Sequence, residues 1–226
     1  MNAALTLPSL GVWRPRTGAT FALAALLLLS AGCGVAPPRF HSLLPLGPAP
    51  VASGLPSTTA AALPRWEQLP VTVPVQVEQP QMVVRMPDDT IALLEEDRWI
   101  APVADEIRAA VSLRIAQQLA DADASAGART PAADGPRWLL AIEVQRFDSA
   151  VGRQARLEAV WSLRRTDAAA PALRCRSVLA QTVGAGVPAL AAAQRGLVAQ
   201  LGAAMANATQ AALAGAVLGC DASMAR

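Results

Sequence analysis

Apolar and polar residues alternate along several short segments of the chain, with the two-residue period of a strand that has one buried face. The clearest segment is 154–164, where apolar residues share one face and mostly polar residues the other. The apolar set is Ala155, Leu157, Ala159, Trp161 and Leu163. This alternation is typical of an antiparallel sheet with one solvated face.

The same period predicts further strands before and after this segment. They cover residues 39–46, 69–78, 81–86, 90–95, 138–147 and 173–183. Residues 87–89 form a turn, so 81–86 and 90–95 are predicted to pair as a hairpin. In 69–78 four valines alternate on one face, and Pro74 among them predicts an edge position or a bulge.

Two segments instead show the spacing of helices. Val103, Ile107, Val111, Ile115 and Leu119 recur every four residues and predict a helix that ends near residue 120. An alanine-rich segment predicts a second helix over 188–218, and loops are expected at 47–64 and 121–135. This order predicts a single α+β domain, a mostly antiparallel sheet with two main helices packed on one face.

The N-terminal residues have the pattern of a secretory signal. Arg14 and Arg16 precede an apolar run at 21–29, and small residues lead to Cys33. The run of about nine residues is half the roughly twenty that a membrane-spanning helix needs. We therefore expect a lipoprotein signal peptide at 1–32, a lipid tether at 33–38, a domain at 39–220 and a C-terminal tail at 221–226.

Small residues directly before a cysteine resemble the bacterial lipobox, which implies that Cys33 carries the lipid. Ser30 stands where that pattern usually has leucine, with Leu29 one place earlier. Each buried CH₂ contributes about 0.8 kcal/mol, so two or three acyl chains anchor a protein stably. Gly34 follows the cysteine; by the sorting rule of enteric bacteria, the absence of aspartate there favours the outer membrane.

Charge narrows the class of partner. The chain has 19 basic and 17 acidic residues, and two of the basic residues precede Cys33. The part after the cut therefore has no net charge. This argues against a nucleic-acid partner, which selects a basic face, and against membrane binding by charge alone.

Residues with catalytic or metal-binding chemistry are sparse. His41 is the only histidine, and Ser42 beside it cannot form a useful catalytic triad with it alone. The three cysteines are far apart, so no zinc site is expected. Gly184 and Gly186 resemble a nucleotide-binding turn only superficially, because the third glycine is missing. The sequence predicts no cofactor and favours a binding or assembly protein over an enzyme.

Two further residue sets leave alternatives open. Cys175 and Cys220 are the only thiols after Cys33, and an oxidising periplasm favours a disulfide between them. Alternatively they stay unpaired, with Cys175 as a small core residue. Trp99 precedes the first helix and is expected to close the core there; the alternative is an exposed interface anchor.

Several motifs resemble the ABC-type transport auxiliary lipoproteins, which include the paraquat-inducible protein C-like group. They are residues 80–85 (PQMVVR), Ile91 and Leu93, residues 98–103 (RWIAPV) before a helix, and the late strand at 140–147. The family often has tyrosines where this chain has Phe40 and His41. The resemblance implies a periplasmic lipoprotein on the outer membrane. It also implies a mammalian-cell-entry-domain partner in an ABC system that moves lipids.

The sequence leaves other functions open. The chain would also fit an assembly factor of another envelope system, and a neighbouring gene for a mammalian-cell-entry-domain protein would separate the two. An envelope hydrolase is disfavoured by the missing nucleophile and base. Self-assembly into a homo-oligomer is a further option, because nothing in the sequence fixes the oligomeric state.

Overall fold

A computed structural model describes residues 37–45, 65–126, 137–166, 171–213, 215–216 and 219–220. The elements in chain order are β1 (Arg39–His41), β2 (Arg65–Gln68), η1 (Val75–Val77), β3 (Gln81–Arg85), β4 (Ile91–Trp99), α2 (Val103–Ala126), β5 (Arg137–Ala150), β6 (Gln154–Arg165), β7 (Leu173–Thr182) and α3 (Val187–Leu213). Two helices accompany one sheet of three strands and one of four, mostly antiparallel. The predicted α+β single domain is confirmed.

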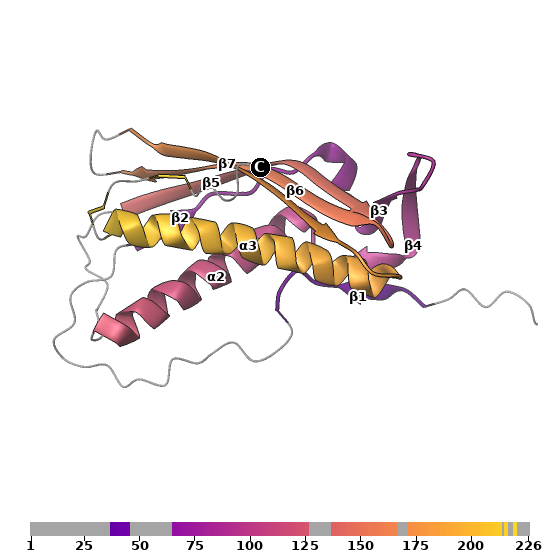
Figure 1. The fold of residues 1–226 in the computed structure, drawn as a ribbon, viewed down its shortest axis with the longest axis horizontal. Coiled ribbons are helices and arrows are strands. Elements are labelled where there is room, and N and C mark those ends of the chain that lie inside the picture. The colour runs from indigo at the N-terminus through magenta and orange to yellow at the C-terminus, as the bar shows by residue number, and fades with distance from the viewer. Residues whose placement is uncertain are drawn as a thin grey trace, which may run out of the picture. The chain divides into compact units, whose positions relative to one another are not determined.

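The larger sheet has the order β2-β5-β6-β7. β5, β6 and β7 are antiparallel neighbours, which confirms the three late strands predicted from alternation. A bulge between Val144 and Arg146 lets the long β5 change face while it stays paired to β6. Figure 1 shows both helices on the same side of this sheet, where the alternating apolar residues form the core.

The smaller sheet has the order β1-β4-β3. β3 and β4 form the predicted hairpin, and β1 pairs with β4 in parallel. β2 also joins its sheet in parallel, beside β5. Alternation shows which face of a strand is buried but not which strand lies next to it, so neither parallel pairing was predicted.

The predicted strand at 69–78 is wrong. Val71 and Val77 are buried, whereas Val75 is 72% exposed, so the valines do not share a face. Thr72 makes a single bridge to Glu143, and the chain then turns through η1. Pro74 lacks an N–H group and cannot continue a ladder of hydrogen bonds. The strand that joins β5 is β2, directly before this segment.

The first helix is longer than predicted. α2 continues to Ala126, past the expected end near residue 120. Its predicted apolar face is buried as expected, from Val103 to Leu119. Residues 121–126 contain no glycine or proline, and three of them are alanine, so nothing in this stretch stops a helix.

The second helix ends earlier than predicted, at Leu213. Gly215 has a φ of 68°, a left-handed conformation that glycine adopts without strain. The Gly215 and Ala216 amides donate to the carbonyl oxygens of Ala212 and Ala211. These two bonds form a Schellman motif, which satisfies carbonyls at a helix end. The spacing of apolar residues after Gly215 therefore predicted helix wrongly there.

Close packing joins the helices and the two sheets. A Cβ added to Gly202 on α3 would lie 3.0 Å from Arg114 Cβ on α2, so glycine allows the helices to approach. Trp99 at the end of β4 is only 5% exposed and lies against Phe147 of β5, with ring centroids 6.1 Å apart. The prediction that Trp99 is a core residue is confirmed. Among the described residues, no helix is long and apolar enough to cross a bilayer.

Candidate functional site

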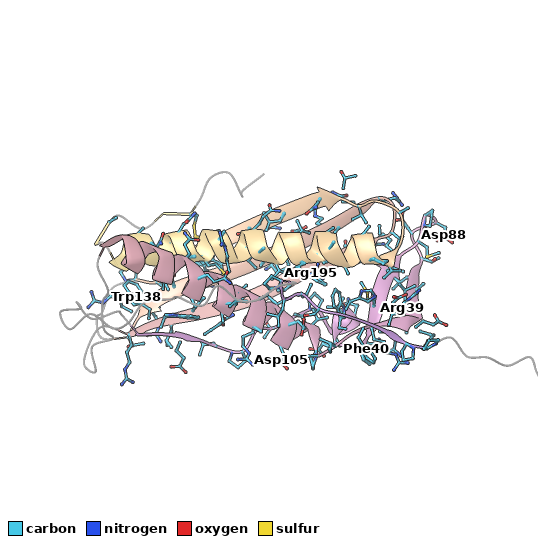
Figure 2. The ribbon with its side chains drawn as sticks, turned by 90° about the horizontal axis from the view of Figure 1, so that it is seen from below. Arg39, Phe40, Asp88, Asp105, Trp138 and Arg195 are labelled. Carbon is cyan, nitrogen blue, oxygen red and sulfur yellow. A yellow bond between two sulfur atoms is a disulfide. The ribbon has the colours of Figure 1, made fainter. Side chains whose placement is uncertain are left out.

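The strand that follows the predicted lipid tether has a polar face bound to one buried carboxylate. Arg39 donates to both oxygens of Asp97, from Nε at 3.0 Å and from a terminal nitrogen at 2.6 Å. His41 Nε2 lies 2.7 Å from Asp97 Oδ1 and must donate, because an ionised carboxylate only accepts. Arg39 and Phe40, labelled in Figure 2, lie on β1, an edge strand of the smaller sheet.

The charge on Asp97 is stabilised by these two partners. Burial by itself would raise the pKa of Asp97, since desolvation disfavours the charged form. The hydrogen bonds and charges of Arg39 and His41 outweigh this effect, so the pKa of Asp97 lies below its usual value. The carboxylate is therefore a stable attachment point for β1 at neutral pH.

The residues after β1 are held by the two helices. The Ser42 hydroxyl and the Leu43 amide both donate to Glu106 Oε2, at 2.7 Å each. Arg195 on α3 donates from two nitrogens to the Ser42 carbonyl oxygen, at 3.0 and 3.2 Å. Residues 39–43 are thus fixed to β4, α2 and α3. We call Arg39, His41, Ser42, Asp97, Glu106 and Arg195 the β1 network.

The same contacts direct the serine and the histidine away from catalysis. The Ser42 proton goes to Glu106, and His41 Nε2 is used on Asp97. A hydrolytic triad requires the serine to donate to the histidine. The β1 network therefore has the geometry of a structural attachment. Among the described residues, no group of three or more histidine, cysteine or acidic side chains could hold a metal ion.

The opposite face of β1 has one large apolar side chain, Phe40, beside Arg98 of β4. Phe40 points away from Asp97 because side chains alternate along a strand, and it is 59% exposed. Ile100, directly after β4, donates its backbone N–H to the His41 carbonyl oxygen at 2.9 Å and is 64% exposed. Two large apolar side chains thus lie in solvent close to the start of the domain. Single exposed apolar side chains are common on protein surfaces, and contact with a membrane or a protein would bury these two.

Replacing Asp97 with asparagine should lower the free energy of unfolding by about 1–3 kcal/mol at pH 7. The pKa of Asp97 is lowered by folding, so its contribution is complete above the unfolded-state value of 3.8 and is lost as pH falls below it. Urea unfolding at pH 7 and pH 3 should therefore show a smaller difference between wild type and Asp97→Asn at pH 3. An equal difference at both pH values would contradict this role.

The structure describes some of the sequence-predicted site residues and not others. Cys33, the predicted signal peptide and the predicted tail at 221–226 lie outside the described residues. Cys175 on β7 and Cys220 are joined as a disulfide, with Cα atoms 5.5 Å apart. That separation is within the usual range for a disulfide. The bridge connects the chain beyond α3 to the edge strand of the larger sheet.

Sequence reasoning missed the roles of Asp97 and Glu106. Asp97 was one member of an acidic run at 95–97, and Glu106 fitted the negative charge preferred at a helix start. The signal that could have found them is the alternation of Arg39, Phe40 and His41. Two cationic or polar side chains on one strand face predict a carboxylate opposite, although the sequence does not say which one.

The fold is an α+β domain in which β1 is bound to β4 and the residues after β1 are bound to both helices. Two solved proteins have a similar fold. A Xanthomonas campestris protein of the family DUF330 has a TM-score of 0.52 and 17% identity, over 76% of this chain and 94% of its own. A second, uncharacterized protein has a TM-score of 0.55 and 12% identity, over 76% of this chain and 98% of its own.

The sequence profile of the family "ABC-type transport auxiliary lipoprotein component" matches residues 46–206. The chain belongs to this family, as its motifs predicted. Membership makes it an auxiliary lipoprotein of an ABC-type transport system and implies a lipid-anchored, non-enzymatic role in the envelope. No curated protein sequence matches the chain significantly.

Proposed function

We propose that Cys33 anchors this chain to the periplasmic face of the outer membrane. There it serves a lipid-moving ABC system by binding a mammalian-cell-entry-domain protein. The β1 network is the observation that carries this proposal. It fixes β1 to β4, and residues 42 and 43 after β1 to both helices, within ten residues of the predicted lipid site.

The tether sets how far the domain can move from its anchor. Residues 34–38 separate Cys33 from β1. A fully extended chain spans at most about 3.6 Å per residue, so the maximum length of the tether is roughly 20 Å. Because β1 is fixed to the domain by the β1 network, it does not dissociate from β4 and add its length to the tether. A partner that crosses the periplasm would meet the domain close to the membrane surface.

Phe40 and Ile100 give this position a contact surface. Both are exposed; Phe40 is on β1, and the Ile100 backbone is hydrogen-bonded to His41 at the end of β1. A membrane interface or the apolar part of a protein partner would bury them, and burial of each large side chain contributes about 1.5–3 kcal/mol. This surface supports docking next to the bilayer and requires no chemistry from the side chains.

Cys33→Ala should abolish lipid attachment and release the protein from the membrane fraction. Metabolic labelling with palmitate should mark the wild type and not the variant, and fractionation should place the wild type in the outer membrane. A strain carrying only Cys33→Ala should share the envelope defect of a transporter deletion. Asp105→Ala, at an exposed position on α2, is the control and should be labelled as the wild type is. Undiminished labelling of Cys33→Ala would rule out the anchor.

A further inference from the structure

A groove runs between the β3–β4 hairpin and β5, away from the β1 network. Its cavity has a volume of about 310 Å³. Val77, Val83, Ile91 and Phe147 give it an apolar lining, and Arg85 and Arg146 also line it. The hairpin stands beside one end of the larger sheet in Figure 1.

A shallower hollow continues the groove along the solvent face of the larger sheet. It shares Arg85, Arg146 and Asp148 with the cavity and adds Arg153 and Arg156. The four guanidinium groups come from β3, β5, β6 and the β5–β6 turn, so the fold gathers residues that are far apart in the sequence. We call the two hollows together the arginine groove.

Carboxylates near the arginine groove do not match its positive charge. Glu158 accepts from Arg156 Nε at 2.9 Å and from an Arg176 terminal nitrogen at 2.7 Å, and it lies 3.5 Å from Arg146 Nε. Asp148 lies 3.7 Å from the same Arg146 nitrogen, so two carboxylates face the three guanidinium groups of Arg146, Arg156 and Arg176 and do not neutralise them. Hydrogen bonding from Arg176, with the charges of the neighbouring arginines, lowers the pKa of Glu158, so the carboxylate is already ionised.

Several guanidinium donors remain free to bind a ligand. Towards described residues, Arg146 and Arg156 make their ion pairs through Nε, which leaves their terminal nitrogens available. Arg153 is exposed and makes no ion pair with any residue that the structure describes. Arg85 uses one terminal nitrogen on Asp89, at 4.0 Å from its carboxylate and 3.4 Å from its carbonyl oxygen. A guanidinium group with free N–H donors can bind two oxygens of a phosphate at once.

We propose that the arginine groove binds an anionic amphiphile through its phosphate. The phosphate lies on Arg85, Arg146 and Arg156, and the adjoining alkyl carbons contact Val83, Ile91 and Phe147. A cavity of about 310 Å³ is at the small end of ligand sites, so it holds a headgroup and the first carbons of a chain. This inference names a class of substrate for the transport system, and it therefore rests on the proposed lipid-transport role.

Calorimetric titration of the full lipoprotein in a non-ionic detergent tests the site. The probes are dihexanoyl phosphatidic acid, dihexanoyl phosphatidylcholine and inorganic phosphate. We expect phosphatidic acid to bind at least about tenfold more tightly than either of the others, since it alone combines net negative charge with alkyl carbons. Inorganic phosphate binding as tightly would make this a free-phosphate site, and equal binding of phosphatidylcholine would exclude selection by charge. Either result would overturn the proposal.

Substitutions in the arginine groove test whether phosphatidic acid binds there. The double variant Arg85→Gln and Arg146→Gln should weaken phosphatidic acid binding by about tenfold or more, because charged hydrogen bonds are lost. Arg108→Gln, an exposed arginine on α2, is the matched control and should bind as wild type. Ile91→Thr should weaken phosphatidic acid binding and leave any inorganic phosphate binding unchanged. Unchanged affinity in the double variant would overturn the site.

Two features keep the result interpretable. If the double variant does not fold by circular dichroism, Arg153→Gln removes an exposed arginine and should still weaken binding severalfold. The titration also contains no partner protein. Absence of phosphatidic acid binding would therefore reject the groove as a lipid site, whereas failure of the proposed transport role would appear as loss of the mammalian-cell-entry-domain partner.

Discussion

Trp99→Ala should lower the free energy of unfolding by about 3–5 kcal/mol. The indole is 5% exposed and lies against Phe147, at a centroid separation of 6.1 Å and an interplanar angle of 58°. It therefore fills the junction between the two sheets. Truncation would leave a cavity there, and the rigid strands on either side cannot collapse to fill it.

Urea unfolding followed by circular dichroism measures this loss. Ile100→Ala is the matched control, because Ile100 is the next residue and is 64% exposed. It should change the free energy of unfolding by less than about 0.5 kcal/mol. Trp99→Ala with an unchanged melting temperature and a lost partner would instead make Trp99 an interface residue, and the core assignment would be wrong.

Removing both cysteines of the bridge, by Cys175→Ala and Cys220→Ala together, should cost about 4 kcal/mol. The bridge closes a loop with a sequence separation of 45 residues, and the chain-entropy account gives a loss of this size. Cys175 is 4% exposed on β7, so alanine suits that position better than serine. The loop includes all of α3, and the variant releases the chain at residue 220, beyond that helix, from β7.

Unfolding with and without a reducing agent separates the bridge from the side chains. Reduction should destabilise the wild type about as much as the double substitution, and it should leave the double variant unchanged. Alkylation followed by mass spectrometry of protein isolated from the envelope should modify neither thiol. If both Cys175 and Cys220 are alkylated without reduction, the bridge is absent in the cell.

Much of the fold could be predicted because it follows from local periodicity. Apolar residues recur at every second position of β6, and the buried residues of α2 recur every four residues. The spacing of apolar residues therefore predicted both elements. The segment at 69–78 has the same period but lies among prolines. There the missing N–H groups outweigh the apolar pattern. The division into two sheets depends on pairings between distant strands, which periodicity does not encode.

The functional surfaces were predicted less completely, for a related reason. Cys33 belongs to a contiguous motif, whereas the sequence left open whether Cys175 and Cys220 are bridged or unpaired. Asp97 and Glu106 acquire their roles only when β1 lies beside β4 and α2. The arginine groove is likewise assembled from several strands. Its residues resemble ordinary solvated charges until the sheets bring them together.

Isolation of the lipoprotein from solubilised envelopes tests the central claim most directly. The experiment uses a strain that encodes a mammalian-cell-entry-domain protein next to this gene, with the lipoprotein tagged at its C-terminus. Mass spectrometry should recover that neighbour with the wild type and much less of it with the double variant Phe40→Ser and Ile100→Ser, whereas Asp105→Ala on the exposed face of α2 should recover it fully. Failure to recover the neighbour with the wild type, at normal lipoprotein abundance, would contradict the proposed function.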